Sequence, residues 1–456
     1  MVSKKETIAY GMSQLATGMT TQAVNMYVYF FYLDTVGLKL ALITLGMTIY
    51  GAWNMINDPL AGFISDRIKT RWGRRRPLIM FFTPILILSF IMLWMPLTPA
   101  GAPFDLWGDV PRAQEITFIY YTFFVSLFDT GFTFVGLAMA SLFPEMAEKN
   151  EERVKLQMAG IILGSGGVAV GMFAFSNDVV KNWGIQRYQM AILVAPLVAF
   201  SLYALVLAYR EKEEFVREKP LPLARAFKET FKNRSFLTFV MYNLMMQYIS
   251  VIVMSMLPFV AKYVTNSDET MLLIGTGSGI GAGVICWSQI VKKRSPRQTA
   301  MIGLFIGSIG SVFFLLANDY YSVLCAAVIM GVGLGAAILL TNVLIANAID
   351  YDETVTGIRR EGIYYGFNAF IIRFSVILSA ITSERILGLF GYISTSQEQP
   401  PSVATGVKII VGLFPLLAMV VGILALYFYP LDGEKLAMLK LKIEEMHREK
   451  RKLVTG

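Results

Sequence analysis

The stretch WNMINDPLAGFISDRIKTRWGRRRP, from Trp53 to Pro77, contains an apolar run of helical length, a carboxylate inside that run and a basic group at its end. Asp58 lies within the apolar part, where a carboxylate is costly unless it is paired, hydrated or bound to a cation. Four arginines follow between residues 71 and 76, and such clusters mark the cytoplasmic ends of membrane spans. The stretch therefore predicts a transmembrane helix with a functional acid.

The whole chain has the composition of an integral membrane protein. Its 456 residues are 55% hydrophobic and only 16% charged, whereas soluble domains carry about 25% charged residues. We expect an all-α membrane protein with twelve transmembrane helices in two six-helix bundles, because a span needs roughly 20 apolar residues. The apolar stretches fall near residues 10–33, 40–63, 77–96, 115–143, 156–175, 188–209, 236–261, 271–291, 299–317, 321–349, 362–391 and 404–429.

The distribution of Lys and Arg predicts the topology. Of these 40 residues, 32 fall in one set of alternate loops and only five in the other, which places both termini in the cytoplasm of a multi-pass protein of the cell (inner) membrane. The net charge of +8 then reflects loop cations, and no nucleic-acid partner is expected. We expect an N-terminal bundle, a cytoplasmic linker, a C-terminal bundle and a cytoplasmic tail at residues 1–209, 210–235, 236–429 and 430–456.

The tail between Glu434 and Leu453 allows two interpretations. It forms an amphipathic helix on the cytoplasmic face, or it is a solvated charged end. The single histidine, His447, lies there, so no catalytic triad and no imidazole metal cluster is expected. Cys286 and Cys325 both lie in apolar runs, which argues against a disulfide framework or a thiolate metal site. We expect no cofactor beyond a coupling ion.

Two halves of six spans are typical of transporters built from repeats, with a substrate site near the middle of the membrane. The alternative from another class is a membrane enzyme. An enzyme needs a metal-binding acid pair or a nucleophile with its base near one leaflet, and the sequence shows neither. We therefore expect a transporter and not an enzyme.

A candidate cation site combines the second and fourth spans. Asn54 lies one helical turn before Asp58, and Asn57 is adjacent to it. Asp129 and Thr133 are likewise one turn apart. Carboxylate and amide oxygens suit Na⁺, or Asp58 binds a proton. The alternative is that Asp58 is structural, in a polar seam between helices, and for Asp129 a structural and a functional role are equally open.

A candidate substrate residue lies in the eleventh span. Arg373 comes eleven residues after Gly362, which places it roughly 16 Å deep, near the centre of the bilayer. A guanidinium there must face a cavity or an acid. Arg373 is therefore a substrate or coupling residue, or one partner of an ion pair that locks the bundle. Asn368 and Tyr364 lie within two turns of it.

Two further groups complete the expected site. Tyr27, Tyr29, Phe132 and Tyr364 offer aromatic rings that stack on a sugar face or simply pack. Near the end of the second span, Asp66 and Arg67 precede Arg74 and Arg75. Such a basic cluster is usually a positive-inside anchor, and the adjacent Asp66 and Arg67 make an ion-pair gate the alternative.

The motifs resemble those of a known family. The stretch from Gly62 to Arg76, GFISDRIKTRWGRRR, resembles the loop signature of the major facilitator superfamily. More specifically, the chain is similar to the glycoside–pentoside–hexuronide:cation symporters, the melibiose-carrier family. The segments that carry this resemblance are YGMSQLATG, YFFYLDTVGL, NDPLAG, TRWGRRRP, SLFPEMAEKNEER and IANAIDYDETVTGIRREGIYYG.

The resemblance implies a major facilitator fold and a cation site on Asn54, Asn57, Asp58 and Thr133, and it puts Arg373 at the position of the family's basic residue on the eleventh helix. The melibiose carriers have a second acid at the position of Asn54, so this site is one charge poorer, and either Na⁺ or a proton remains compatible with it. They also have sugar-binding acids at the positions of two glycines of this chain, Gly18 and Gly136.

Without those acids, and with Arg373 central, an anionic substrate is favoured. We predict a secondary active transporter that couples a monovalent cation to a sugar or glycoside, such as a hexuronide, by alternating access. A lysolipid carrier of the same fold is the alternative, because eukaryotic relatives of the family resemble lysophospholipid carriers. We expect a monomer in the lipid bilayer.

Overall fold

The structure is a computed structural model. It describes residues 2–29, 31–68, 70–96, 110–176, 183–211, 229–266, 269–392 and 399–455. Most of the expected linker at 210–235 lies outside these residues, so its structure is not described.

Among the described residues, the first half of the chain forms six helical segments. The first begins at Ser3, whose side chain accepts from the backbone N–H of Glu6 in a capping box. The elements are α1 (Lys4–Ala23) with η1 (Val24–Val28) and η2 (Phe31–Thr35), α2 (Leu40–Arg67), α3 (Arg76–Leu93), α4 (Val110–Met146), α5 (Asn150–Ala174) and α7 (Arg187–Ala208).

The second half also forms six segments, followed by a terminal helix. The 37-residue α13 begins at Asp319, which accepts from two backbone N–H groups, and ends at Gly357. The left-handed φ of 73° at Gly357 favours glycine. The elements are α10 (Arg234–Val260) with η3 (Ala261–Thr265), α11 (Glu269–Ile290), α12 (Pro296–Leu316), α13 (Tyr320–Thr356), α14 (Glu361–Ile372) with α15 (Phe374–Leu389), α16 (Ser402–Lys408) with η4 (Ile409–Leu413) and α17 (Phe414–Tyr427), and α18 (Gly433–Thr455).

Four of these described segments are interrupted, and two of the interruptions lie beside residues of the main polar group between the halves. The first passes from α1 into the π-helical η1 and η2, and such distortions are frequent at functional sites. The eleventh is broken between α14 and α15, and Arg373 is the residue at the break. Discontinuous spans of this kind form the substrate sites of many transporters.

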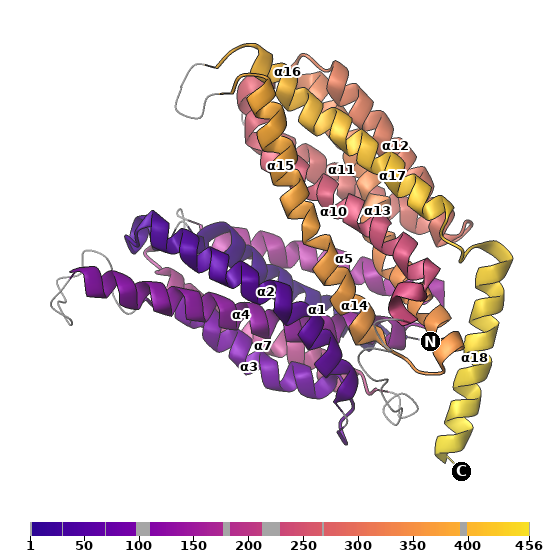
Figure 1. The fold of residues 1–456 in the computed structure, drawn as a ribbon. Coiled ribbons are helices and arrows are strands. Elements are labelled where there is room, and N and C mark those ends of the chain that lie inside the picture. The colour runs from indigo at the N-terminus through magenta and orange to yellow at the C-terminus, as the bar shows by residue number, and fades with distance from the viewer. Residues whose placement is uncertain are drawn as a thin grey trace.

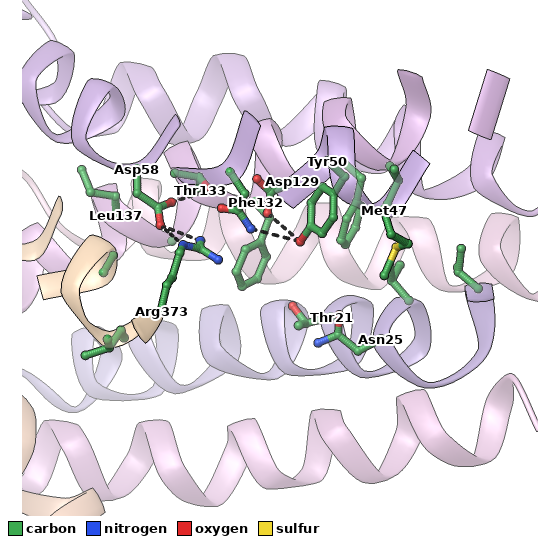
Figure 2. A pocket seen from close by; sticks show the side chains of 18 of the residues that line it. Thr21, Asn25, Met47, Tyr50, Asp58, Asp129, Phe132, Thr133, Leu137 and Arg373 are labelled. Atoms are coloured by element: carbon green, nitrogen blue, oxygen red, sulfur yellow. Dashed lines mark hydrogen bonds and ion pairs between the residues drawn. The ribbon is translucent and has the colours of Figure 1, made fainter. Parts of the chain in front are cut away.

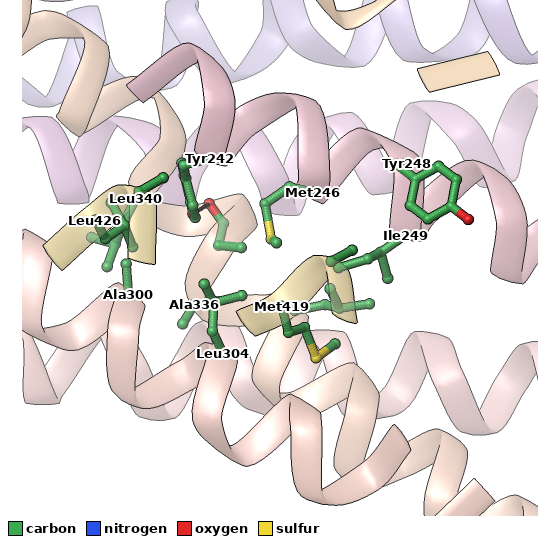
Figure 3. Packing of buried hydrophobic residues seen from close by; sticks show 14 of the residues in the cluster. Tyr242, Met246, Tyr248, Ile249, Ala300, Leu304, Ala336, Leu340, Met419 and Leu426 are labelled. Atoms are coloured by element: carbon green, nitrogen blue, oxygen red, sulfur yellow. Dashed lines mark hydrogen bonds between the residues drawn. The ribbon is translucent and has the colours of Figure 1, made fainter. Parts of the chain in front are cut away.

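The buried apolar residues form two main clusters, one in each half. Figure 3 shows part of the C-terminal cluster, where Tyr242 and Met246 of α10 lie against Leu304 of α12 and Met419 of α17. In Figure 1 the two bundles meet near α14, with α18 beside the meeting point, and diverge toward α16. We call the meeting point the α18 end.

Glycines allow the halves to approach closely at the α18 end. A Cβ atom on Gly62 of α2 would lie 2.5 Å from the carbonyl oxygen of Gly362 of α14. A Cβ atom on Gly362 would in turn lie 2.7 Å from the carbonyl oxygen of Gly62. The two backbones therefore touch, which small residues permit between membrane helices.

The all-helical fold is confirmed. Ten helices in the described part of the chain are long and apolar enough to cross a membrane. α1 and α2, which we also expect to span, are not among these ten. Both carry polar side chains that face the interior, such as Thr17 in α1 and Asn54 in α2, and these side chains lower their apolar character.

The tail forms a helix, and the interpretation as a solvated charged end is wrong for its described residues. Leu436, Leu439 and Ile443 of α18 are buried against the C-terminal cluster. His447 is fully buried as well. The apolar stripe of α18 therefore packs on protein.

Candidate functional site

A cavity of about 420 Å³ lies between the two halves, walled by η1, α2, α4 and α14. Its polar lining includes Asp58, Asp129, Thr133, Asn368 and Arg373. Figure 2 shows Arg373 reaching from the C-terminal half toward Asp58, while Thr21 and Asn25 face the cavity from the opposite side. We call this space the main cavity.

An ion pair between the two halves lies in its wall. Arg373 donates to Asp58 Oδ2 from Nε at 2.8 Å and from a terminal nitrogen at 2.5 Å. Asp58 Oδ1 accepts from the Thr133 hydroxyl at 3.2 Å. The Asp58 side chain is 5% exposed, but that of Arg373 is 36% exposed. The pair is thus buried on one side and open to the cavity on the other.

The neighbouring amides have oxygens without a donor. Asn54 donates to the Tyr50 hydroxyl at 3.1 Å, and Asn57 donates to Asp129 Oδ2 at 3.3 Å. The side-chain oxygens of Asn54 and Asn57 are buried and have no hydrogen-bond partner in the described chain. Buried polar atoms are normally satisfied, so these oxygens are candidate ligands for a small cation.

Asp129 belongs to the same group of side chains. Its other oxygen, Oδ1, accepts from the Tyr50 hydroxyl at 3.3 Å, as Figure 2 shows. The structure therefore brings together the five residues expected at the cation site, and it adds Tyr50. The guanidinium of Arg373 lies beside Asp58, at the place where we expect the coupling cation. This position agrees with the interpretation of Arg373 as one partner of an ion pair.

Some of the expected substrate residues line the main cavity, and others do not. Asn368 lines the main cavity and accepts from Asn243 at 2.8 Å. Tyr364 does not line it: its ring is buried beside Phe236, and its hydroxyl accepts from Asn233 at 2.9 Å. The helical phase turns the adjacent Tyr365 to the cavity instead.

Tyr29, one of the aromatic residues expected to stack on substrate or to pack, and Tyr365, which lies near Arg373 in the sequence, both line the main cavity. The hydroxyl of Tyr365 is buried and has no partner in the described chain. Tyr27, which we expect to bind substrate, instead donates to the carbonyl oxygen of Met172 in α5 at 2.8 Å. A shift of one residue along a helix decides whether a side chain faces the cavity. The sequence of a uniformly apolar span does not show which of its faces is turned to the cavity.

A second cavity, of about 490 Å³, shares Thr21 and Phe132 with the main cavity. Amides line it from three helices: Gln14 of α1, Gln157 of α5 and Asn342 of α13. Asn342 donates to Gln157 at 3.0 Å across the two halves. This polar lining carries no formal charge, which suits hydroxyl groups.

The two glycines that replace the acids of the melibiose carriers lie at these cavities. Gly18 lines the second cavity, and a Cβ there would lie 2.7 Å from the carbonyl oxygen of Gly164. Gly136 lines the main cavity, and a Cβ there would meet nothing within 4 Å. Only the position of Gly136 has room for a side chain.

Three of the four expected gate residues meet at the α18 end. Arg75 pairs with Asp66 and also lies 3.2 Å from Glu361 of the other half. Asp66 accepts from the backbone N–H groups of Gly362 and Ile363 at 3.0 and 2.8 Å, which caps α14. Arg74 lies 3.7 Å from Glu361. Burial alone would lower the pKa of Arg75, but the two carboxylates raise it above its ordinary value.

Arg67, the fourth expected gate residue, is exposed and lies over the ring of Phe63 at 3.9 Å. The ion-pair cluster at the α18 end instead includes charges that the sequence did not single out. Arg153 of α5 contacts Asp350 of α13 at 2.9 Å, and Arg359 contacts Glu361 at 2.5 Å. Their signal was the density of charge in IDYDETVTGIRREG, from Ile349 to Gly362.

α18 covers this charge cluster. His447 Nε2 lies 3.1 Å from Glu353 of α13, and its Nδ1 lies 3.6 Å from Glu148 of the first half. Lys440 pairs with Asp350 at 2.7 Å. Burial alone would lower the pKa of His447, but Glu148 and Glu353 raise it above its ordinary 6.5. α18 therefore contacts both halves.

The fold matches those of solved transporters. The chain superposes on the fucose:proton symporter of E. coli with a TM-score of 0.65, at 10% identity, covering 92% of this chain and 98% of that one. It also matches a bacterial homologue of the iron transporter ferroportin in an outward-facing state, with a TM-score of 0.65 at 14% identity over 93% and 99% of the chains. The major facilitator fold is therefore confirmed.

Curated relatives align along the whole chain. The "Glucuronide carrier protein homolog" of Escherichia coli is 23% identical over 100% of this chain and 98% of its own. The "Isoprimeverose transporter" of Lactiplantibacillus pentosus is 22% identical over 99% and 94%. The "Sodium-dependent lysophosphatidylcholine symporter 1" of Mus musculus is 22% identical over 97% and 88%.

The family comparison agrees with this fold. Residues 9–433 match the family described as "MFS/sugar transport protein", which covers nearly all of the described helices. Together with the relatives, this match confirms the resemblance drawn from the motifs. The chain is a multi-pass membrane protein and belongs to the MFS/sugar transport protein family.

Proposed function

We propose that this protein couples the entry of a monovalent cation to the uptake of a sugar or glycoside, by alternating access. The observation that carries the proposal is the ion pair between Asp58 and Arg373 in the wall of the main cavity. A buried acid, a partly exposed guanidinium and two amide oxygens without donors meet at one place between the halves.

The ion pair provides a way to couple the two ligands. Na⁺ or a proton that binds Asp58 competes with the guanidinium for the same carboxylate. Arg373 is then released toward the cavity, where it pairs with an anionic group of the substrate. The cation and the substrate thus favour the same state, and coupling requires that each bind this state more tightly than the other.

The amide-lined second cavity would hold the neutral hydroxyls of the sugar, while Arg373 would hold its carboxylate. A hexuronide or another acidic glycoside has both groups. Tyr365 adds to the wall of the main cavity a hydroxyl that has no partner among the described residues. The names of the glucuronide and isoprimeverose carriers support a glycoside substrate.

The excess of Lys and Arg in one set of loops supports an orientation in the cell membrane in which the α18 end and both termini face the cytoplasm. The halves meet at this end and diverge at the other (Figure 1), so the structure corresponds to an outward-facing state. A monomer contains both halves of the site. The protein would act without enzymatic chemistry and without a resident cofactor.

The test is uptake into proteoliposomes under an imposed Na⁺ gradient or pH gradient. We expect one gradient to drive accumulation of a glucuronide, and Asp58→Asn to lower gradient-driven accumulation by about a hundredfold, because coupling is lost. Glu384→Gln removes an exposed carboxylate of α15 and serves as the matched control. Full gradient-driven accumulation by Asp58→Asn would refute the cation assignment.

Arg373 is tested by comparing two substrates. Arg373→Gln should raise the half-saturating concentration of a glucuronide at least tenfold, and that of the matching neutral glucoside much less, because only the first loses a charge-assisted pair. Equal effects on both substrates would show that Arg373 does not contact the carboxylate.

A lysolipid is the second candidate substrate. The relative named as a sodium-dependent lysophosphatidylcholine symporter supports it, as do the apolar residues Val28, Phe128 and Ile372 in the wall of the main cavity. The same proteoliposomes can be tested with a labelled lysophosphatidylcholine. Its uptake, without uptake of any glycoside, would show that the substrate is a lysolipid and not a sugar.

A further inference from the structure

A third cavity, of about 490 Å³, lies at the junction of α5, α11, α12 and α18. Its basic residues are Lys155, Lys292 and Arg294. Because α5 belongs to the first half and α11 and α12 to the second, its walls come from both halves. We call it the basic cavity, and the proposed transport cycle does not use it.

The basic cavity lies at the depth of lipid headgroups. Its α5 residues fall between Asn150 and Met158, at the start of that span. Its α11 residues fall at the end of that span, and Pro296 is the first residue of α12. Membrane helices pass from hydrocarbon to headgroups where their apolar spans end, so lipid headgroups reach this cavity.

The charge of the lining favours an anion. Three cations face one carboxylate, that of Glu151. Lys292 donates to Gln289 at 2.5 Å, and no ion pair joins Lys155 or Arg294 to a carboxylate of the described chain. α12 also begins at this cavity with Ser295 as its cap, and a helix N-terminus adds positive potential.

The remaining lining fits the rest of a phospholipid. The side-chain oxygen of Asn150 is buried and has no donor in the described chain, so it can accept from a headgroup hydroxyl. Val154, Met158 and Leu436 provide an apolar surface beside these polar groups. A cavity with cations, an acceptor and apolar walls suits an amphiphilic anion better than a free inorganic ion.

We propose that the basic cavity binds the headgroup of an anionic phospholipid such as phosphatidylglycerol. Lys155 and Arg294 pair with its phosphate, Asn150 accepts from its glycerol, and Val154 with Met158 contacts the start of its acyl chains. A lipid held by both halves stabilises the state in which they meet at the α18 end.

The test is a titration of the delipidated, full-length protein with dioleoylphosphatidylglycerol, followed by native mass spectrometry. Each juxtamembrane cation contributes about fivefold in affinity, so the double variant Lys155→Gln/Arg294→Gln should bind this lipid at least tenfold more weakly. The control is Lys149→Gln/Lys293→Gln, which removes one exposed cation from each half just outside the cavity. It should bind within about twofold of the unmodified protein.

Two comparison ligands identify the source of the phosphate. We expect dioleoylphosphatidylcholine to bind much more weakly, because its headgroup has no net charge, and glycerol phosphate to compete poorly, because it lacks acyl chains. Equal binding of the two lipids, saturation by glycerol phosphate alone, or equal losses in the test and control variants would each overturn the proposal.

A second readout follows the conformation. In a Cys286→Ser/Cys325→Ser background, the thiol of Asn25→Cys reports on the main cavity. Phosphatidylglycerol should speed its labelling in this background and should have no effect once Lys155→Gln/Arg294→Gln is added. Lipid binding without any change in labelling would refute the claim that the lipid stabilises the state in which the halves meet at the α18 end.

Discussion

Asp58 and Arg373 illustrate how two residues that are each unfavourable in a membrane become compatible as a pair. Both lie within membrane spans, and each contributes the counter-charge of the other at 2.5 Å. The side chain of Arg373 remains 36% exposed, and it lines the main cavity. Water or substrate there can therefore replace part of the interaction that the guanidinium loses when its pair with Asp58 opens. The ion pair therefore forms in this state, and the exposure of Arg373 to the main cavity would allow another anion to take the place of Asp58.

The pair predicts non-additive stability at the residue scale. Asp58→Asn and Arg373→Gln should each destabilise the protein by about 1–2 kcal/mol, less than for a fully buried pair, because each leaves one charge without its partner. The double variant should lose less than the sum of the two. Thermal unfolding of all four proteins in detergent measures this cycle, and simple additivity would show that the pair contributes nothing to stability.

Single residues also show the limit of sequence reasoning. The motif around Asp58 identified the acid and its amide neighbours, and the depth of Arg373 in the eleventh span identified that residue separately. The sequence did not reveal that Arg373 forms an ion pair with Asp58, because the two residues are separated by 315 positions in the chain. It also selected Tyr364 in place of Tyr365, since helical phase in a uniformly apolar span has no sequence signal.

At the scale of elements, the crossing of α2 and α14 depends on two glycines. Gly62→Ala places a methyl group 2.5 Å from the Gly362 carbonyl oxygen, so the halves should separate at the α18 end and close at the other. Labelling of the Asn25→Cys thiol, in the background without native cysteines, should slow several-fold. Gly51→Ala on the same helix, where a Cβ meets nothing within 4 Å, is the control.

Unchanged labelling in the Gly62→Ala variant would mean that the α2–α14 contact does not set the conformation. A loss of folding would show instead as a fall in thermal stability.

α18 makes a pH-dependent contact with the rest of the molecule. Because Glu148 and Glu353 raise the pKa of His447 above 6.5, its contribution to docking is fully present below 6.5 and is lost as the pH rises through the raised value. Limited trypsin digestion of α18 should therefore be several-fold faster at about pH 8.5 than at about pH 5.5, after correction for trypsin activity. His447→Gln should remove this difference, and an unchanged difference in that variant would assign it to another group.

At the scale of the whole molecule, the charges at the α18 end hold the two halves together. Glu361 is fully buried and contacts Arg75 of the first half and Arg359 of the second. Glu361→Gln leaves these arginines with fewer carboxylates, and losing one partner of a buried pair costs about 3–5 kcal/mol. We expect the conformational equilibrium to shift toward the state closed at the opposite end.

Slower labelling of Asn25→Cys in the Glu361→Gln protein measures this shift. The control is Glu384→Gln, an exposed acid of the same interrupted span. If both variants label at the rate of the parent, the ion pairs at the α18 end do not control which side is open.

The sequence by itself determined the class of protein, the number and order of the apolar segments, the family and the acid that we propose as the cation site. These are local properties: composition, run length and motif spacing carry them directly. Only the tertiary structure decided that Arg373 pairs with Asp58, that α18 packs on both halves, and that Glu361, Arg153 and Arg359 join the gate. Those facts depend on which helices become neighbours, and long-range packing in an apolar environment leaves no periodic signal in the chain.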